Sequence, residues 1–265
     1  MQPMLNIAVR AARAAGDVIM RSVDRLDTLT VETKQRNDFV SEVDREAEAR
    51  IIQIIKRSYP SHGILAEESG EQPGDGYQWI IDPLDGTTNF LHGVPHFAVS
   101  IALAHEGRLQ QAVIYDPVRQ ELFTASKGAG AELNNHRVRV SRCRDLDGAL
   151  LGTGFPFREG QPKDAYMAML GDFIGCTTGV RRPGAAALDL AYVAAGRLDG
   201  FWEMGLSRWD IAAGALLVRE AGGIIGDLRG GEDYLRTGDV IAANPKVYHA
   251  MTQVIEPHLD ALNQS

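Results

Sequence analysis

Cysteine is scarce in this chain of 265 residues, which contains only Cys143 and Cys176. Two cysteines are too few for a disulfide framework or for a zinc site built from cysteine ligands. Such sparing use of cysteine fits a reducing compartment. We therefore expect a cytosolic protein.

Long apolar runs are also missing from the sequence. No uninterrupted apolar stretch approaches the roughly 18 residues that a membrane-spanning helix needs. Near the start of the chain, Arg10, Arg13 and Asp17 interrupt the apolar residues. The segment from Met4 to Asp24 is therefore predicted as an amphipathic helix and not as an export signal, and no membrane partner is expected.

The chain has no excess of positive charge either. It contains 27 Lys+Arg against 35 Asp+Glu, which gives a formal net charge of −8. This balance argues against nucleic-acid phosphate as a bulk partner. With 45% apolar and 23% charged residues, the composition is that of an ordinary globular protein, and it excludes disorder as the main theme.

The pattern of apolar and turn residues divides the chain into two halves. In residues 1–145, a second helix is predicted from Glu42 to Arg57, opened by Ser41 with Asp44 three residues later as a capping box. Short apolar runs with hairpin-length connections then predict a largely antiparallel sheet. The predicted strands are Leu29–Lys34, Ile64–Leu65, Trp79–Ile81, Phe97–Ala104, Gln111–Tyr115 and Glu121–Ala125.

Residues 146–265 alternate between strand and helix patterns, which predicts a layered α/β half. The predicted strands are Ala149–Thr153 and Leu198–Trp202, and the predicted helices run from Pro162 to Phe173 and from Trp209 to Ala221. We therefore expect an α+β first half packed on an α/β second half, as two subdomains of one unit.

Trp79–Phe90, with the sequence WIIDPLDGTTNF, is the most informative segment. A buried strand is expected to deliver Asp82 and Asp85 into a turn shaped by Pro83 and Gly86. Carboxylates held in this way suit a hard cation such as Mg²⁺, and two such ions about 4 Å apart would share a bridging aspartate. The ordinary alternative is a surface turn, but the five fixed positions of D-x-x-D-G-T-T make a chance match rare.

Two further acidic positions gain meaning beside this motif. Glu67 and Glu68 precede Asp82 by some fifteen residues, and Asp210 opens a predicted helix in the second half. Taken alone, the first pair is equally well explained as a solvated loop, and Asp210 as a charge favoured by the helix dipole.

With these residues the sequence resembles the inositol monophosphatase family of Mg²⁺-dependent, Li⁺-inhibited phosphatases, most closely its bacterial SuhB-type members. The resemblance runs from the first helix to about Asn244. Its motifs are AEES at Ala66–Ser69, WIIDPLDGTTNF at Trp79–Phe90 and WDIAAGALLVREAGG at Trp209–Gly223. It implies a layered αβαβα sandwich, the fold shared with fructose-1,6-bisphosphatase, and three separate blocks in order make the signal specific.

The resemblance also implies roles for individual residues. The implied Mg²⁺ ligands, for two or three ions, are the carboxylates of Glu67, Asp82, Asp85 and Asp210 and the backbone carbonyl of Leu84. The implied catalytic residues are Glu67, Thr87 and Asp44. The implied substrate contacts are Asp85, Gly86, Thr87, Gly184, Ala185, Ala186, Glu203 and Asp210. Lys34 matches a basic position near the site.

One segment departs from the family pattern. Many relatives have Gly-Thr-Ala or Gly-Ser-Ala where this chain has Gly184-Ala185-Ala186, so a hydroxyl that could touch the substrate is missing. The implied reaction is hydrolysis of myo-inositol phosphate by a metal-activated water positioned by Thr87 and Glu67. No activated cysteine or histidine stands out as a nucleophile, and no phosphoenzyme is expected.

Other small phosphate esters are rival substrates for the same chemistry: fructose 1,6-bisphosphate, 3′-phosphoadenosine 5′-phosphate, histidinol phosphate and NADP. Glu203 favours a polyol, because a buried carboxylate left without a hydroxyl partner costs affinity. A small phosphorylated polyol is therefore the expected substrate.

A binding function is the second rival, because SuhB-type relatives are implicated in ribosomal RNA transcription and antitermination through RNA polymerase and Nus factors. Local basic clusters could meet an acidic partner or RNA. They are Arg137, Arg139, Arg142 and Arg144, and the pair Arg181-Arg182. The plainer interpretation of these arginines is a solvated face. The resemblance also implies a homodimer.

Overall fold

The computed structural model of this chain describes residues 3–28, 31–35, 38–157 and 160–263, with side chains except at residues 27–40 and 263. The predicted basic position Lys34 therefore lies outside the described side chains. Within the described ranges, no helix is both long and apolar enough to cross a membrane.

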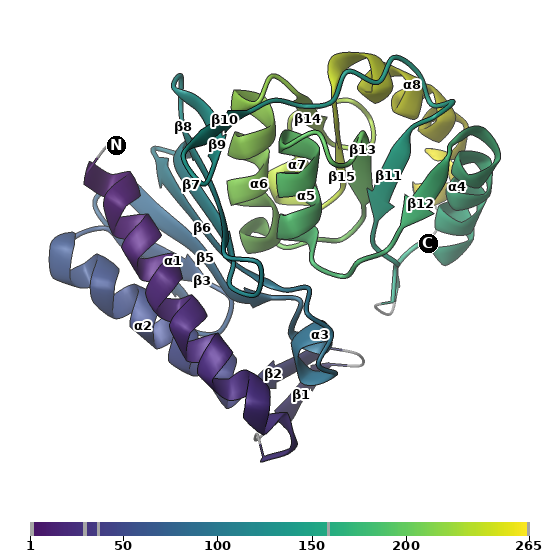
Figure 1. The fold of residues 1–265 in the computed structure, drawn as a ribbon. Helices are drawn as coiled ribbons and strands as arrows, with labels where there is room; N and C mark the ends of the chain where they lie inside the picture. Colours follow the sequence, from purple (N-terminus) through teal and green to yellow (C-terminus); the bar gives the residue numbers. More distant parts are fainter. Residues whose placement is uncertain (1–2, 29–30, 36–37, 158–159, 264–265) are drawn as a thin grey trace.

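Helices and sheets alternate in layers, as Figure 1 shows. Helices α1 (Pro3–Ser22) and α2 (Glu42–Ser58) cover one face of an eight-stranded sheet. Helices α5 (Ala186–Ala194) and α6 (Arg208–Glu220) lie between that sheet and a five-stranded sheet. Helices α4 (Lys163–Cys176) and α8 (Pro245–Ile255) cover the outer face of the second sheet. The predicted αβαβα sandwich is confirmed.

The first sheet has the strand order β10-β9-β8-β7-β6-β5-β3-β4. Every neighbouring pair is antiparallel except β3 with β5, which confirms the largely antiparallel prediction. The strand bounds are β3 Gly63–Ala66, β4 Gly70–Gln72, β5 Tyr77–Asp85, β6 Ala98–His105, β7 Arg108–Asp116, β8 Glu121–Ser126, β9 Gly130–Leu133 and β10 His136–Val138.

The second sheet has the order β12-β11-β13-β15-β14, with β11 parallel to both of its neighbours and the other pairs antiparallel. Its strands are β11 Leu150–Thr153, β12 Gly179–Arg181, β13 Gly200–Glu203, β14 Ile224–Gly226 and β15 Val240–Ala243. A small hairpin of β1 (Val31–Gln35) and β2 (Asp38–Ser41) precedes α2. The remaining short elements are α3 Thr87–Leu91, α7 Tyr234–Thr237, η1 Val23–Thr28, η2 Glu256–His258 and η3 Ala261–Asn263.

Alternation along β5 explains how one strand serves two layers. Successive side chains of a strand point to opposite faces. Trp79 and Ile81 pack in the core beneath α1 and α2, whereas Ile80 packs on the side of α5 and α6. Because both faces of the sheet are covered, the residues Trp79–Ile81 are all apolar. The strand is buried from Trp79 to Asp85.

Several elements were not predicted from the sequence. They include the short strands β4, β9, β10, β12, β14 and β15 and the helix α8. Each of these strands has only three or four residues, too few to show a period-two pattern. Helix α2, in contrast, begins as predicted, with the Ser41–Asp44 capping box formed.

Candidate functional site

The end of strand β5 carries the paired carboxylates. The sequence predicted a turn after Ile81, and this is wrong in part: β5 continues to Asp85, which pairs with Ala98 of β6. The pairing register shifts between Asp82 and Asp85, so an irregularity within the strand takes the place of the turn. Asp82 Oδ1 accepts a hydrogen bond from the Leu84 N–H at 2.9 Å, which fixes this carboxylate against its own backbone.

Asp85 connects this strand to the second half of the chain. Its Oδ2 accepts a hydrogen bond from the Ala187 N–H at 2.7 Å, in the first turn of α5. A carboxylate is favoured there by the donors and the dipole at a helix N-terminus. Gly86 follows with φ 92°, and a Cβ at this position would lie 3.0 Å from the His96 carbonyl oxygen. Glycine is therefore required at the start of α3.

Thr87 and Asp44 meet beside the Leu84 carbonyl. Thr87 Oγ1 lies 2.9 Å from Asp44 Oδ1 and 3.0 Å from the Leu84 carbonyl oxygen. The other oxygen of Asp44 accepts from both the N–H and the hydroxyl of Ser41, at 2.8 and 2.5 Å. Burial raises the pKa of Asp44, against the lowering effect of its hydrogen bonds to Ser41 and Thr87. The N-cap of α2 thus holds the group that contacts the Thr87 hydroxyl.

The segment that carries Glu67 is fixed from α2. Glu48, a buried residue of that helix, accepts from the N–H groups of Glu68 and Ser69 at 2.8 and 2.9 Å. The Glu67 N–H itself donates to the Ile81 carbonyl at 3.2 Å. Glu67 therefore follows β3 in a defined turn, and not in a solvated loop. The supporting role of Glu48 was not predicted from the sequence.

Asp210 comes from the second half of the chain, in the first turn of α6. Its Oδ2 accepts from the Ser207 N–H at 2.7 Å. This is the helix-capping role that the sequence offered as the plain alternative, and it uses one oxygen of the carboxylate. Capping and a place in the site are therefore compatible.

A single pocket of about 750 Å³ brings the predicted residues together. It is lined by eleven of the twelve predicted positions: Glu67, Asp82, Leu84, Asp85, Gly86, Thr87, Gly184, Ala185, Ala186, Glu203 and Asp210. Asp44 is not part of the lining and reaches the site through Thr87. Elements from both halves of the chain meet at this pocket, which is typical of a ligand site.

Crowded carboxylates raise one another's pKa in this pocket. Burial raises the pKa of Asp82 well above its usual value, and the neighbouring charges of Glu67, Asp85 and Asp210 raise it further. Burial also raises the pKa of Asp85 strongly, with Asp210 the largest of its charged contributors. Buried like charges oppose ionisation unless an opposite charge compensates them. The arrangement is suited to a cation.

The donor set decides which cation fits. Within the described ranges, no group of three or more His, Cys, Asp or Glu side chains is already placed so that it could hold a metal ion. The acidic side chains instead face a common pocket, together with a backbone carbonyl. Mg²⁺ prefers oxygen ligands and keeps several waters, so it needs only one or two carboxylates directly. The residues present fit Mg²⁺ better than a nitrogen- or sulfur-seeking ion.

Several residues of the pocket were missed from the sequence. The lining includes Phe155, Phe157 and Arg182, and the Arg182 guanidinium lies 5.5 Å from the centre of the Phe155 ring. From the sequence, Arg182 belonged to a basic pair that could meet an acidic partner or RNA, with a solvated face as the plainer interpretation. The structure places Arg182 at the pocket. The lining also contains His92 and Trp209. The contacts of Phe155, Phe157 and Arg182 lie outside the three sequence motifs and depend on packing between distant segments.

Asp189 of α5 is a buried carboxyl close to the site. Burial raises its pKa well above the usual value, and the charges of Glu203 and Asp85 raise it further. Its Oδ1 has no hydrogen-bond partner among the described residues. Asp189 is thus a buried carboxyl that lies outside the pocket lining.

Comparison with known proteins gives a consistent result. The model of the inositol monophosphatase family matches residues 1–259. A Nus factor SuhB from Pseudomonas aeruginosa is 58% identical over 265 residues, covering 98% of each chain. The crystal structure of extragenic suppressor protein suhB from Bartonella henselae superposes with a TM-score of 0.94 at 45% identity, covering 96% of this chain and 99% of that one. An inositol monophosphatase from Anabaena superposes with a TM-score of 0.86 at 40% identity, covering 96% and 95%.

Proposed function

The chain belongs to the inositol monophosphatase family, a family of phosphatases, and from this premise we propose that it hydrolyses myo-inositol 1-phosphate to myo-inositol and phosphate in a Mg²⁺-dependent reaction. One observation carries the proposal. Five carboxylates, the end of strand β5 and the N-terminus of α5 surround a single pocket. Such a site can hold cations, a phosphate and a polyol side by side.

We assign the metal ligands by position. Glu67, Asp82 and the Leu84 carbonyl form one set, and Asp82, Asp85 and Asp210 form a second that shares Asp82. Bound there, Mg²⁺ supplies positive charge for the phosphate dianion and the leaving oxygen and lowers the pKa of a water molecule. Asp82 and Asp85 each use one oxygen for a backbone N–H, at 2.9 and 2.7 Å, which orients the carboxylates before any ion binds.

Thr87 and Asp44 handle the nucleophilic water. Thr87 Oγ1 can donate to Asp44 Oδ1 at 2.9 Å and so presents its lone pairs to a water in the pocket. The raised pKa of Asp44, caused by burial, makes this carboxyl a better proton acceptor than an exposed aspartate. Glu67 faces the same pocket and holds the water from the other side. No covalent phosphoenzyme is needed.

The substrate alcohol is assigned to the second-half side of the pocket. Glu203 lies at the end of β13 and is packed so closely against Gly154 that a Cβ there would lie 1.9 Å from the carboxylate. A carboxylate fixed in this way discriminates for a ligand with hydroxyl groups. Gly184, Ala185 and Ala186 line the same side, so recognition there uses backbone groups and not a hydroxyl side chain.

A substrate panel tests the proposal. Phosphate release would be measured with myo-inositol 1-phosphate, fructose 1,6-bisphosphate, 3′-phosphoadenosine 5′-phosphate, histidinol phosphate and NADP at equal concentrations, with and without Mg²⁺ and with Li⁺. We expect the inositol ester to have the highest kcat/KM and Li⁺ to inhibit. A higher kcat/KM for a nucleotide would reject the polyol assignment while keeping the phosphatase.

A role in transcription antitermination is a second proposed function. A relative 58% identical to this chain is named a Nus factor, and a basic strip is exposed here. It consists of Arg137, Arg139, Arg142 and Arg144. Figure 1 shows the connection that carries most of these residues, which leaves β10 and passes β14 toward α8. Asn244 donates to Ser141 Oγ and to the Cys143 carbonyl, both at 3.1 Å, and these bonds hold the connection in place.

Charge reversal tests this second function. Arg142→Glu with Arg144→Glu should abolish co-purification with RNA polymerase and Nus factors and leave phosphate release unchanged, because neither residue lines the pocket. Unchanged complex formation would reject the basic strip as the contact surface. We further propose that the protein is a homodimer, which sedimentation tests, and that it is located in the cytosol, which cell fractionation tests. We also propose that the chain forms two subdomains, residues 1–145 and 146–265.

A further inference from the structure

Asn89 of α3 contacts three backbone carbonyl oxygens at once. Its side-chain Nδ2 lies 2.8 Å from the His96 oxygen, 2.9 Å from the Pro183 oxygen and 3.4 Å from the Gly184 oxygen. An amide carries its donors on nitrogen alone, so three acceptors around one end determine which way the side chain points. Asn89 therefore fastens the loop before α5 to the loop before β6, and we call these three contacts the Asn89 clamp.

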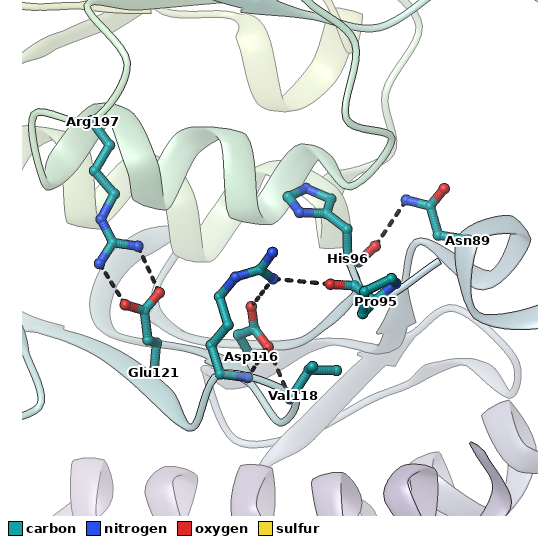
Figure 2. A network of polar contacts seen from close by, with 8 residues as sticks. Asn89, Pro95, His96, Asp116, Val118, Glu121 and Arg197 are labelled. Carbon is teal, nitrogen blue, oxygen red and sulfur yellow. Dashed lines mark hydrogen bonds and ion pairs between the residues drawn. The ribbon is translucent and has the colours of Figure 1, made fainter. Parts of the chain in front are cut away.

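One side of this clamp is anchored in the first sheet. The Arg119 guanidinium donates to the Pro95 carbonyl at 3.0 Å and to the buried Asp116 carboxylate at 2.9 Å. Figure 2 labels Pro95 and Asp116 in this network. Asp116 ends strand β7 and also accepts from the N–H groups of Val118 and Arg119 at 2.9 Å. The His96 carbonyl next to Pro95 is thus a fixed reference point, and Asn89 bonds to it (Figure 2).

The other side of the clamp determines how two peptide groups are turned. In a trans peptide the C=O of one residue and the N–H of the next point in opposite directions, and the described residues contain no cis bond. The oxygens of Pro183 and Gly184 both face Asn89. The N–H groups of Gly184 and Ala185 therefore point away from it.

Both of these N–H groups belong to residues of the pocket lining. Gly184 and Ala185 line the pocket, whereas Asn89 does not. No described residue accepts a hydrogen bond from the N–H of either residue. Gly184 has φ 95°, and a Cβ there would lie 3.1 Å from Asn89 Nδ2, so the loop is pressed closely against the clamp. Two backbone donors are thereby presented to a ligand.

We propose that Asn89 is a positioning residue for the substrate: by holding the carbonyls of Pro183 and Gly184, it aims the N–H groups of Gly184 and Ala185 at the hydroxyl oxygens of the polyol. This inference rests on the proposed phosphatase function. It gives this chain a means of recognition at the position where a hydroxyl side chain is missing. Asn89 contacts neither substrate nor the assigned metal ligands.

Kinetics of Asn89→Ala test the inference. For myo-inositol 1-phosphate we expect KM to rise about tenfold, on the order of losing one or two hydrogen bonds, with kcat changed less than about threefold. For p-nitrophenyl phosphate, which has no polyol, KM should stay within about twofold. Asn89→Ser, which restores one donor, should recover part of the lost affinity. Equal changes for both esters, or a fall in kcat alone, would overturn the inference.

A matched control separates positioning from a general loss of stability. Asn134 also clamps a turn, accepting from the Leu122 N–H at 2.9 Å and donating to the Gln120 carbonyl at 3.3 Å, far from the pocket lining. Asn134→Ala should leave the KM ratio of the two esters unchanged. If it shifts that ratio as Asn89→Ala does, the effect is structural and the inference fails.

Hydrogen exchange provides a test that does not depend on activity. Amides of residues 184–187 should exchange at least about tenfold faster in Asn89→Ala than in wild type, because the loop has lost its tether. Unchanged exchange would overturn the inference even if the enzyme is active. A different result is possible: the amides exchange faster in Asn89→Ala, but the wild-type protein hydrolyses no ester. The proposed function then fails, and the role of Asn89 in aiming N–H groups at the substrate fails with it. Asn89 would remain a residue that tethers the loop.

Discussion

The two sides of the pocket are built from different groups. The first-half side presents carboxylates, Asp82 and Asp85 from β5 and Glu67 from the turn after β3. The second-half side presents the backbone and small side chains of Gly184, Ala185 and Ala186 at the start of α5, beside larger side chains such as Phe155 and Arg182. It adds only two carboxylates, Glu203 and Asp210.

This difference separates two tasks. Side chains that carry charge can hold cations and a phosphate, whatever alcohol is attached. Backbone groups and one fixed carboxylate, Glu203, read the shape and the hydroxyls of the alcohol. The metal side should therefore govern turnover and the second-half side should govern affinity. Asp85 connects the two, because its Oδ2 caps α5 at 2.7 Å.

The largest effect is expected from a change on the metal side. Asp82→Asn removes the carboxylate shared by both assigned ligand sets and should lower kcat for every phosphate ester by about 1000-fold or more. Asparagine keeps an oxygen that can accept from the Leu84 N–H, as Asp82 does at 2.9 Å, so the fold should persist. Phosphate release and the circular dichroism melting curve check both statements. A folded Asp82→Asn enzyme with normal turnover would remove the distinction between the two sides.

A cavity beside α5 and α6, the helix layer between the two sheets, should destabilise both sides of the pocket together. Phe201 of β13 is fully buried in the core that joins α5 and α6 to the sheets. Phe201→Ala should reduce the free energy of unfolding by about 3–5 kcal/mol. Denaturant titration measures this loss. A loss below about 1 kcal/mol would show that this layer does not hold the two halves in register.

Glu203→Gln is expected to affect the second-half side alone. It keeps the size of the side chain and removes the charge that discriminates for hydroxyls, so KM for myo-inositol 1-phosphate should rise about tenfold. Because the residue is not an assigned metal ligand, the Mg²⁺ concentration for half-maximal rate should stay unchanged. Steady-state kinetics at several Mg²⁺ concentrations measure both. A shifted Mg²⁺ requirement would show that the two sides are not separate.

The smallest effect concerns the first sheet far from the pocket. His62 Nδ1 accepts from Trp79 Nε1 at 3.1 Å, and its ring stacks on Tyr59 and Tyr77 with centroids 4.6 Å apart. Burial lowers the pKa of His62 below its usual value of 6.5. As the pH falls, His62 is therefore protonated in the unfolded chain before it is protonated in the folded one. The free energy of unfolding should fall as the pH drops below about 6.5, by less than about 1.4 kcal/mol per pH unit.

His62→Gln is the variant that checks this pH effect. It should flatten the dependence of the unfolding free energy on pH below about pH 6.5, the unperturbed histidine pKa at which the unfolded chain begins to bind the proton. KM and kcat at neutral pH should not change, because His62 does not line the pocket. An unaltered slope in the variant would assign the titration to another group.

The sequence predicted the side chains of the site better than their setting. Asp82 and Asp85 stand in a motif that predicts a cation site, and Ser41 with Asp44 forms the expected capping box. Both features can be recognised because each depends on residues that lie within a few positions of one another in the sequence. The same motif was expected to turn after Ile81, but β5 continues to Asp85 because pairing with Ala98 of β6 extends the strand.

The second-half side of the pocket was far less visible in the sequence. The placement of Phe155 and Arg182 at the pocket depends on packing between β11, β12 and the loop before α5, which no local pattern encodes. Asn89 stood inside the most informative motif, yet its role depends on carbonyls at Pro183 and Gly184, over ninety positions away. Backbone recognition leaves no residue-type signature.

The most direct test of the account is the Mg²⁺ dependence of phosphate release from myo-inositol 1-phosphate, measured on the metal-stripped wild-type protein and again after Mg²⁺ is restored. Clustered carboxylates with raised pKa values at Asp82 and Asp85 predict no turnover without the ion and full recovery with it. Turnover that persists in chelator, at the rate measured with Mg²⁺, would contradict the central claim that these carboxylates form a metal-dependent phosphatase site.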